Sequence, residues 1–154
     1  CFRADSEVSL DYDSIKENGG IIGSGTLKIF PASSCAVEIA KEIMLYLSQQ
    51  SCGKCVFCRE GTFQIGEILK DLVDSKCSLS DIEQMLLIAE EMQKGCICGL
   101  GTNACNPLLS CYKLFSSDFN SHLKKQPCPV KNGNDTFSRG SETTKGQNSG
   151  VGGE

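Results

Sequence analysis

The chain has 154 residues, a net charge of −4 and a pI of about 5.1, which allows one domain of ordinary size or a small domain with tails. This acidic balance excludes the basic face that binds nucleic acid, and no apolar run is long enough to cross a bilayer. No signal-peptide pattern opens the sequence, so we expect a cytoplasmic protein without direct membrane insertion. Because the first residue is Cys1 rather than methionine, we expect either a fragment or an internally started chain.

Residues 1–32 combine a short helical segment with a strand pattern. The segment 11–17 predicts a short helix, and a glycine-rich turn follows at 19–25. Residues 26–30 alternate between polar and apolar side chains, which predicts a strand that stops at Pro31. The glycines lack the full G-x-G-x-x-G pattern and precede a strand, so they indicate a turn and not a phosphate-binding loop.

Apolar residues then repeat at helical spacing and predict four amphipathic helices. The first covers about 34–49, and the second runs from just after a cysteine-rich loop to about Asp74. Ser80 and Glu83 form a capping-box pair that would open the third. Asn106, followed by proline, would begin the fourth. The side chains expected to face inward are Ala36, Ile39, Ala40, Ile43, Leu47, Ile65, Ile68, Leu69, Leu72, Ile82, Met85, Leu86, Ala89, Leu108, Cys111, Phe115 and Phe119.

Four such helices with short connections predict a mainly α fold, a small four-helix bundle over residues 33–125. Two cysteine-containing loops, 51–58 and 95–105, would meet at one end of this bundle. Residues 126–154 are mostly glycine, serine, threonine, asparagine and charged residues, a composition that predicts a disordered tail.

Eleven cysteines dominate the chemistry of the sequence. An odd number without a secretory signal argues against an extracellular disulfide scaffold. Cys52, Cys55 and Cys58 stand at positions i, i+3 and i+6 of one loop. Three thiolates at this spacing suit three corners of a [4Fe–4S] cube, in which one cysteine holds each iron.

Spacing alone does not select the fourth ligand of such a cluster. Cys96, Cys98 and Cys105 all lie in or near the second loop, which is rich in glycine. Glycines let a loop bend tightly and bring backbone N–H groups close to the cluster sulfurs. Such N–H groups stabilise the reduced cluster and help to set its potential.

A zinc-binding structural or interaction module is the main alternative. Zinc ligands usually come as two pairs and not as three thiols in one loop, so the spacing favours iron and sulfur. We expect Cys35 and Cys111 to be small buried residues of helices, and Cys77 to lie in a polar turn. His122 is expected near the end of the last helix, where a partly charged imidazole suits the helix dipole. The sequence contains no recognisable catalytic triad, carboxylate pair or nucleotide-binding loop.

Segment 51–62 resembles the S-C-G-x-C-x-P-C-R-x-G signature of the NADH-binding flavoprotein subunits of respiratory complex I and of related hydrogenase and formate dehydrogenase diaphorase subunits. Segment 97–101 is similar to the F-C-x-L-G element of this family, and 115–123 resembles its closing helix. Residues 11–15 with the glycines at 23 and 25 resemble the end of its β-grasp domain, here 1–32. The resemblance covers most of residues 5–125.

This resemblance implies that Cys52, Cys55, Cys58 and Cys98 bind one [4Fe–4S] cluster, with Cys96 as an additional thiol. In the family, a hydride passes from NADH to FMN, and single electrons then leave through this cluster. The resemblance therefore implies an electron-transfer module of an NADH dehydrogenase-type oxidoreductase. Its partners would be other subunits of a redox complex, of ferredoxin-like or [2Fe–2S] type, peripheral to a membrane.

Three departures from the family pattern stand out. The glycine-rich loop for FMN and NADH is absent, so FMN and NADH are expected only in a full-length subunit. Phe57 replaces the usual proline between the second and third cysteines. Residues 122–129 resemble the start of a cysteine-bearing extension, but no second cysteine follows Cys128, so a further cluster is not expected. The roles of Cys96, Cys105 and Cys128 stay open.

Overall fold

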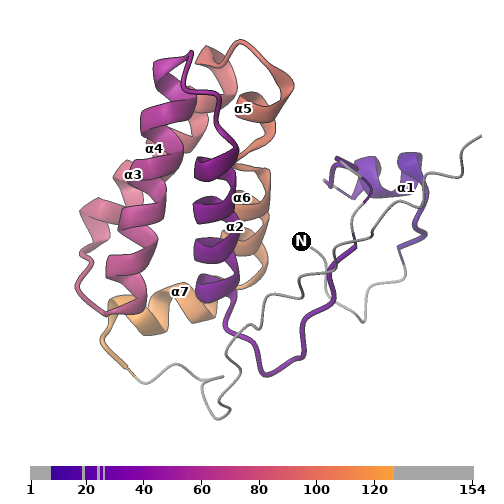
Figure 1. The fold of residues 1–154 in the computed structure, drawn as a ribbon. Coiled ribbons are helices and arrows are strands. Elements are labelled where there is room, and N and C mark those ends of the chain that lie inside the picture. Colours follow the sequence, from indigo (N-terminus) through magenta and orange to yellow (C-terminus); the bar gives the residue numbers. More distant parts are fainter. Residues whose placement is uncertain (1–7, 19, 24, 26, 127–154) are drawn as a thin grey trace, which may run out of the picture.

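The computed structural model describes residues 8–18, 20–23, 25 and 27–126, and within them the regular elements are all helices (Figure 1). The main unit is built from three long helices, α2 (Ala36–Gln50), α3 (Val56–Val73) and α4 (Leu79–Gly95). The shorter helices are α1 (Tyr12–Glu17), α5 (Gly99–Asn103), α6 (Asn106–Leu114) and α7 (Ser116–Leu123). A mainly α fold is thus confirmed.

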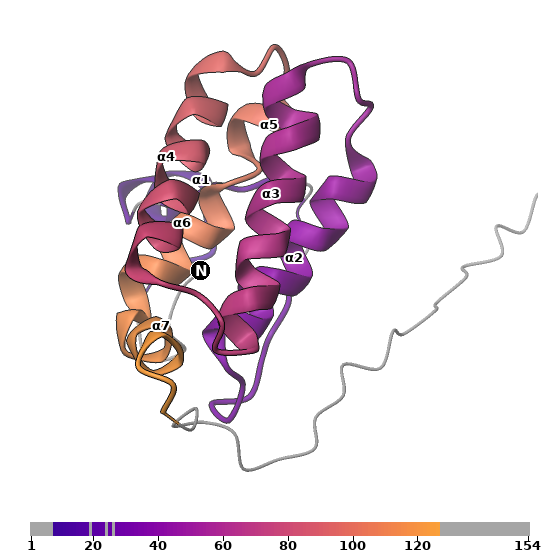
Figure 2. The same cartoon turned by 90° about the vertical axis from the view of Figure 1, so that its left-hand side faces the viewer.

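The core lies between the long helices and α6. α2 packs against α3 and α6, and α3 packs against α4, so the apolar stripes of these helices meet along one interior (Figures 1 and 2). Most of the side chains predicted to face inward are buried there. The buried face of α2 differs slightly from the predicted one. Val37 and Met44 are fully buried, whereas Ile39 and Ile43 are only partly buried.

The expected fourth helix is broken into two. α6 ends at Leu114, Phe115 departs from helical geometry with φ −124° and ψ 38°, and α7 follows at an angle beneath the long helices (Figure 1). The break lets α7 contact α2, α3 and α6, and it buries Phe119 completely. The simple four-helix bundle is therefore not confirmed, because the last apolar stripe is divided between two helices that cover different parts of the core.

The start of α4 also differs from the prediction. The capping box involves Ser78 and Asp81, and the Ser78 backbone N–H donates to Asp81 Oδ2 at 2.7 Å. This N–H is also the main reason why the pKa of Asp81 is lowered. The helix begins at Leu79, earlier than the Ser80–Glu83 pair indicates, because an aspartate at the third helical position accepts the cap hydrogen bond equally well.

The N-terminal segment contains the predicted short helix but not the predicted strand. α1 is capped by Asp11, whose Oδ1 accepts from the Ser14 N–H at 2.9 Å. Residues 27–30 are irregular, whereas residue 26 lies outside the described residues. A strand needs a neighbouring strand for its backbone groups, and the described residues contain none. A β-grasp remnant is thus not confirmed.

The domain boundaries at 32/33 and 125/126 stay predictions. The predicted disordered tail lies outside the described residues except for Gln126, as does Cys128. Within the described part of the chain, no helix is both long and apolar enough to span a membrane.

Candidate metal centre

The first cysteine loop connects α2 to α3 at one end of the helical unit. Cys52 is exposed in the loop, Cys55 is the N-cap residue of α3, and Cys58 is buried in the first turn of that helix. α3 thus begins at Val56, within the cysteine triplet and not after it as predicted. The helix start fixes the direction of Cys58 relative to Cys55, which a flexible loop would not do.

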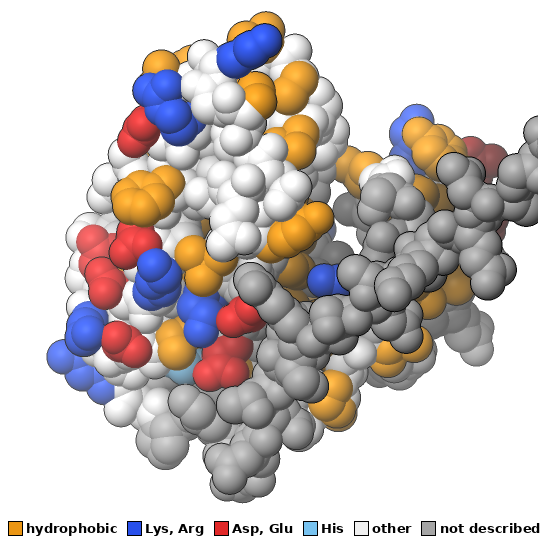
Figure 3. Space-filling model, viewed as in Figure 1, with side chains coloured by type: hydrophobic (Ala, Val, Ile, Leu, Met, Phe, Trp, Pro, Cys, Tyr) orange, Lys and Arg blue, Asp and Glu red, His pale blue; other side chains and the backbone are white. Residues whose placement is uncertain are grey.

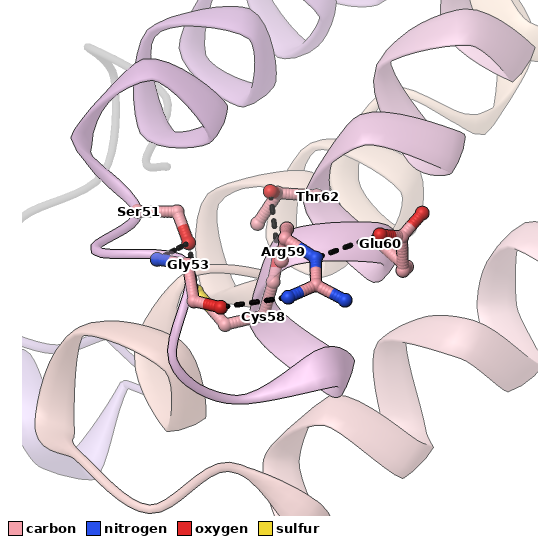
Figure 4. Close-up of polar contacts among 6 residues, drawn as sticks. All are labelled: Ser51, Gly53, Cys58, Arg59, Glu60 and Thr62. Atoms are coloured by element: carbon pink, nitrogen blue, oxygen red, sulfur yellow. Dashed lines mark hydrogen bonds and ion pairs between the residues drawn. The ribbon is translucent and has the colours of Figure 1, made fainter.

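Polar contacts hold this loop in shape (Figure 4). Ser51 Oγ accepts from the Gly53 N–H and from Cys58 Sγ, both at 3.3 Å. Arg59 Nη1 donates to the Gly53 carbonyl oxygen at 2.9 Å. Gly53 has φ +76°, a left-handed conformation that favours glycine at this turn. Ser51, Gly53 and Arg59, all part of the sequence signature, therefore set the loop conformation between the first two cysteines.

The second cysteine loop connects α4 to the one-turn helix α5, which the sequence did not predict. Cys96 is the C-cap residue of α4 and Cys98 is the N-cap residue of α5. A Cβ at Gly101 would lie 2.7 Å from Cys96 Sγ, and one at Gly95 would lie 2.7 Å from the ring of Phe57. A side chain at either glycine would therefore require Cys96 or Phe57 to move, and the contact between Gly95 and Phe57 joins the two loops directly.

The surroundings of Cys55 include groups from both loops. The nearby backbone N–H groups of Cys58 and Ile97 lower the pKa of the Cys55 thiol, and the Cys96 side chain lowers it further. One N–H comes from each loop. The Cys55 sulfur is therefore placed where backbone dipoles favour its thiolate form, the form that binds metal.

The Cys96 thiol lies in surroundings that raise its pKa. Burial raises its pKa to about 12, and the neighbouring Cys55 side chain raises it further. A Cβ at Gly101 would lie 2.7 Å from Cys96 Sγ and 3.4 Å from the Cβ of Cys58, so Cys96 lies close to the first cysteine loop. Cys52 belongs to the same loop, where its exposed side chain lines a shallow hollow with Gly53 and neighbouring residues.

The other cysteines lie away from this point or deeper in the core. Cys105 Sγ contacts Met92 Sδ at 3.5 Å, and burial raises its pKa to about 12. Cys111 is buried on α6, as predicted. Cys77 is buried too and donates to the Ile68 carbonyl oxygen at 3.2 Å, whereas the sequence indicated a polar turn.

A buried polar cluster at the opposite end was missed by the sequence analysis. Cys35 Sγ lies 3.3 Å from His122 Nε2, and the N–H of Ala36 at the start of α2 donates to Asp118 Oδ2 at 3.1 Å. His122 is in the last turn of α7, as predicted, but it is buried and faces Cys35. The two chain segments are far apart in sequence, so helix periodicity gave no sign of this contact.

The donor set at the cysteine end suits an iron–sulfur cluster. Among the described residues, no three His, Cys, Asp or Glu side chains converge closely enough to form a group suited to one metal ion. A cubane cluster has a different requirement, one thiolate on each of four irons with N–H groups directed at the sulfurs. The free thiols of the two loops and the N–H groups around Cys55 meet the chemical part of this requirement.

Comparison with known proteins agrees with this donor set. Residues 38–122, more than half of the chain, match the family model for the NADH-ubiquinone oxidoreductase-F iron-sulfur binding region. An NADH-quinone oxidoreductase subunit from Streptomyces coelicolor is 31% identical over 123 residues, covering 80% of this chain and 27% of that protein. The NADP-reducing hydrogenase subunit HndC of Solidesulfovibrio fructosivorans is 30% identical over 126 residues, covering 82% and 26%.

A solved structure shows the same fold. The crystal structure of NAD+-reducing [NiFe]-hydrogenase in the H2-reduced state superposes with a TM-score of 0.64 at 24% identity, covering 71% of this chain and 19% of that one. The chain thus spans about a quarter of the length of the curated relatives it matches. From the family match and the donor set together, the chain belongs to the family of the NADH-ubiquinone oxidoreductase-F iron-sulfur binding region, whose cofactor is a [4Fe–4S] cluster.

Proposed function

We propose that Cys52, Cys55, Cys58 and Cys98 hold the [4Fe–4S] cluster and that the chain is the one-electron relay of an NADH dehydrogenase-type subunit. When bound, the cluster accepts and releases one electron at a time. The observation that carries this proposal is the packing of the two cysteine loops against each other, in which Gly95 lies against the ring of Phe57 and a Cβ at Gly101 would contact both Cys96 Sγ and the Cβ of Cys58.

The protein contributes a fixed site and an electrostatic environment. Cys58 is anchored in the first turn of α3, and its Sγ lies 3.3 Å from Ser51 Oγ. The N–H groups of Cys58 and Ile97 stabilise negative charge on the Cys55 sulfur, which favours metal binding and the more reduced state. Gly101 leaves the space in which the side chain of Cys96 lies.

The cysteine end also has an exposed apolar surface. Val56, Phe57, Ile97 and Leu100 are large apolar side chains that remain at least two-fifths exposed there. On the face shown in Figure 3, charged side chains of both signs gather over the lower part of the long helices, and at the upper end orange side chains lie among white atoms and a few blue and red side chains. This surface suits contact with the remainder of a full-length subunit that would bind FMN and NADH.

The wider assembly follows from the relatives. Their names describe NADH-quinone oxidoreductase and NADP-reducing hydrogenase subunits, which supports a place in a multi-subunit redox complex. We propose partners of ferredoxin-like or [2Fe–2S] type, and a cytoplasmic location that includes the periphery of a membrane complex. Electrons would enter from FMN on the remaining part of the subunit and leave toward these partners.

The test is metal content after anaerobic reconstitution of the full 154-residue chain. We expect about four irons and four sulfides per chain and an EPR signal on reduction. Stoichiometric zinc without iron would instead support the structural zinc module.

The ligand assignment is tested by a matched pair of variants. Cys98→Ser should abolish or convert the cluster, since a hydroxyl is a poorer iron ligand than a thiolate. Cys96→Ser should keep its iron content. Because the two thiols are two positions apart, Cys96 can substitute in part when Cys98 is lost, and the double variant resolves this. Retention of the cluster in Cys98→Ser with its loss in Cys96→Ser would reverse the assignment.

A further inference from the structure

Ser51 is the residue before the first cysteine of the triplet, and its hydroxyl contacts the third cysteine. Its Oγ lies 3.3 Å from Cys58 Sγ and 3.3 Å from the backbone nitrogen of Gly53 (Figure 4). Ser51 is half-buried, and Cys58 is buried. The chain turns back between the end of α2 and the start of α3, so this hydroxyl reaches the sulfur of a proposed ligand seven positions further on.

The chemistry of the two partners fixes the direction of this hydrogen bond once Cys58 binds iron. A thiol can donate across the contact, but a thiolate has no proton and can only accept. The Gly53 N–H can only donate, so it occupies a lone pair of Ser51 Oγ. Of the two described groups that contact the hydroxyl, the Cys58 sulfur is therefore the one that can accept the Ser51 O–H proton.

We propose that the Ser51 hydroxyl donates a hydrogen bond to the ligand sulfur of Cys58 and thereby raises the reduction potential of the cluster. This inference rests on the proposed function, in which Cys58 is a ligand. Uptake of one electron spreads negative charge onto the ligand sulfurs, and a hydrogen bond to a more negative acceptor is stronger. The hydroxyl therefore stabilises the reduced form more than the oxidised form. Ser51 is a positioning residue, since it acts through Cys58 and does not bind iron.

Backbone hydrogen bonds on both sides hold this hydroxyl in place. Ser51 is the C-cap residue of α2, and its N–H donates to the Ser48 carbonyl oxygen at 3.3 Å. Gly53 adopts its left-handed conformation at φ +76°, and its carbonyl oxygen accepts from Arg59 Nη1 at 2.9 Å. Cys58 belongs to the first turn of α3. Because donor and acceptor are both attached to hydrogen-bonded backbone, the hydroxyl has few positions other than beside the sulfur.

The experiment compares Ser51→Ala with Ser51→Thr in the reconstituted full chain. Alanine removes the donor, whereas threonine keeps it, and the extended backbone of Ser51 suits a β-branched side chain. Iron content should equal that of wild type in both, because neither change removes a thiolate. At the wild-type midpoint potential, the ratio of reduced to oxidised cluster should fall about tenfold in Ser51→Ala, the order of one hydrogen bond. This fall equals about 59 mV for one electron. Ser51→Thr should recover most of it.

Ser48→Ala is the matched control. Ser48 lies one turn earlier on α2 and lines the same shallow hollow as Ser51, but of these two hydroxyls it is that of Ser51 that contacts Cys58 Sγ. Cys77→Ala is a second control, because it removes a buried thiol at the connection between α3 and α4, at the other end of α3. Both controls should keep the wild-type potential.

A second readout detects the donated proton itself. The Ser51 O–H proton exchanges with solvent, so ENDOR spectra of the reduced cluster in H2O and D2O should contain a coupling from it. This coupling should be lost in Ser51→Ala and kept in Ser51→Thr and Ser48→Ala. A merely structural role of the side chain would not produce this pattern.

The outcomes separate the two proposals. If wild type holds no iron–sulfur cluster, the proposed function fails. If Ser51→Ala retains its iron but has an unchanged or higher potential and an unchanged proton coupling, the tuning role is overturned while the relay stands. A fall in potential that Ser48→Ala shares, or that Ser51→Thr does not recover, also overturns it. Loss of iron in Ser51→Ala overturns it too, because the hydroxyl would then be needed for assembly and not for tuning.

Discussion

The polar side chains at the two ends of the helical unit differ in burial and in their partners. At the end formed by the start of α2 and the end of α7, Asp118, His122 and Cys35 are all buried, and their partners are other groups of the protein. At the cysteine end, Cys52 and Cys98 are exposed, and the nearby backbone N–H groups of Cys58 and Ile97 lower the pKa of the Cys55 thiol.

This difference separates what folds the chain from what binds the cofactor. Buried polar groups that satisfy one another stabilise a unique packing without help from outside. At the cysteine end, Cys52 and Cys98 are exposed and Cys55 is half-buried, and nearby backbone N–H groups favour the thiolate of Cys55. We therefore expect the fold to depend on the core and its closed end, and cofactor binding to depend on exposed residues that contribute little to stability.

The largest effect is expected from the core. Leu69 on α3 is fully buried, and Leu69→Ala should lower the free energy of unfolding by about 2–5 kcal/mol through lost apolar contact and a residual cavity. Urea unfolding of the cluster-free chain, followed by circular dichroism, measures this change. Leu87 on α4 is exposed, and Leu87→Ala serves as the control with a change within about 0.5 kcal/mol. Equal losses in both variants would contradict the assigned core.

This core was largely predictable from sequence. Ile65, Leu69 and Leu72 recur at helical spacing, and all three are fully buried on α3. Periodicity identifies which face of a helix is buried, but it does not report where one long stripe breaks. The break at Phe115 depends on where α7 finds space beneath the other helices, which is a property of the assembled unit.

A smaller effect is expected at the closed end. Asp118 accepts from the N–H of Ala36 at the start of α2, and no side chain of its own helix caps α2 at Cys35. Asp118→Ala should therefore cost about 1–2 kcal/mol of unfolding free energy, the range for a lost helix cap. Asp118→Asn keeps an acceptor oxygen and should lose less. If both variants unfold at the wild-type urea concentration, α7 does not cap α2.

The site was predictable to the extent that its residues are close in sequence. Cys52, Cys55 and Cys58 form one loop, and their spacing alone indicated a cluster. The approach of Gly95 to the ring of Phe57 and the contact of Cys35 with His122 join positions far apart in sequence. Neither is encoded by a local pattern, so both appear only when the helices are packed. α5 was missed because a single turn is too short to show periodicity.

The smallest effect on stability is expected from substitutions of the proposed cluster ligands. These substitutions test the difference between the two ends of the molecule most directly. In the cluster-free chain, Cys52→Ala and Cys98→Ser should change the free energy of unfolding by no more than about 0.5 kcal/mol, since both side chains are exposed. Cys98 is moreover the N-cap residue of α5, where serine is a preferred residue, so Cys98→Ser has no reason to destabilise that turn.

After reconstitution the same variants should differ sharply from wild type. A cofactor that binds only the folded chain stabilises it, so the wild-type urea midpoint should rise when the cluster is assembled. Neither variant should show the full rise, because a ligand is missing, whereas Cys77→Ala should show it. Paired urea titrations with and without cluster, under anaerobic conditions, measure both quantities in one series. If Cys52→Ala or Cys98→Ser unfolds the cluster-free chain, the cysteine end contributes to the fold itself, and the separation between the two ends does not hold.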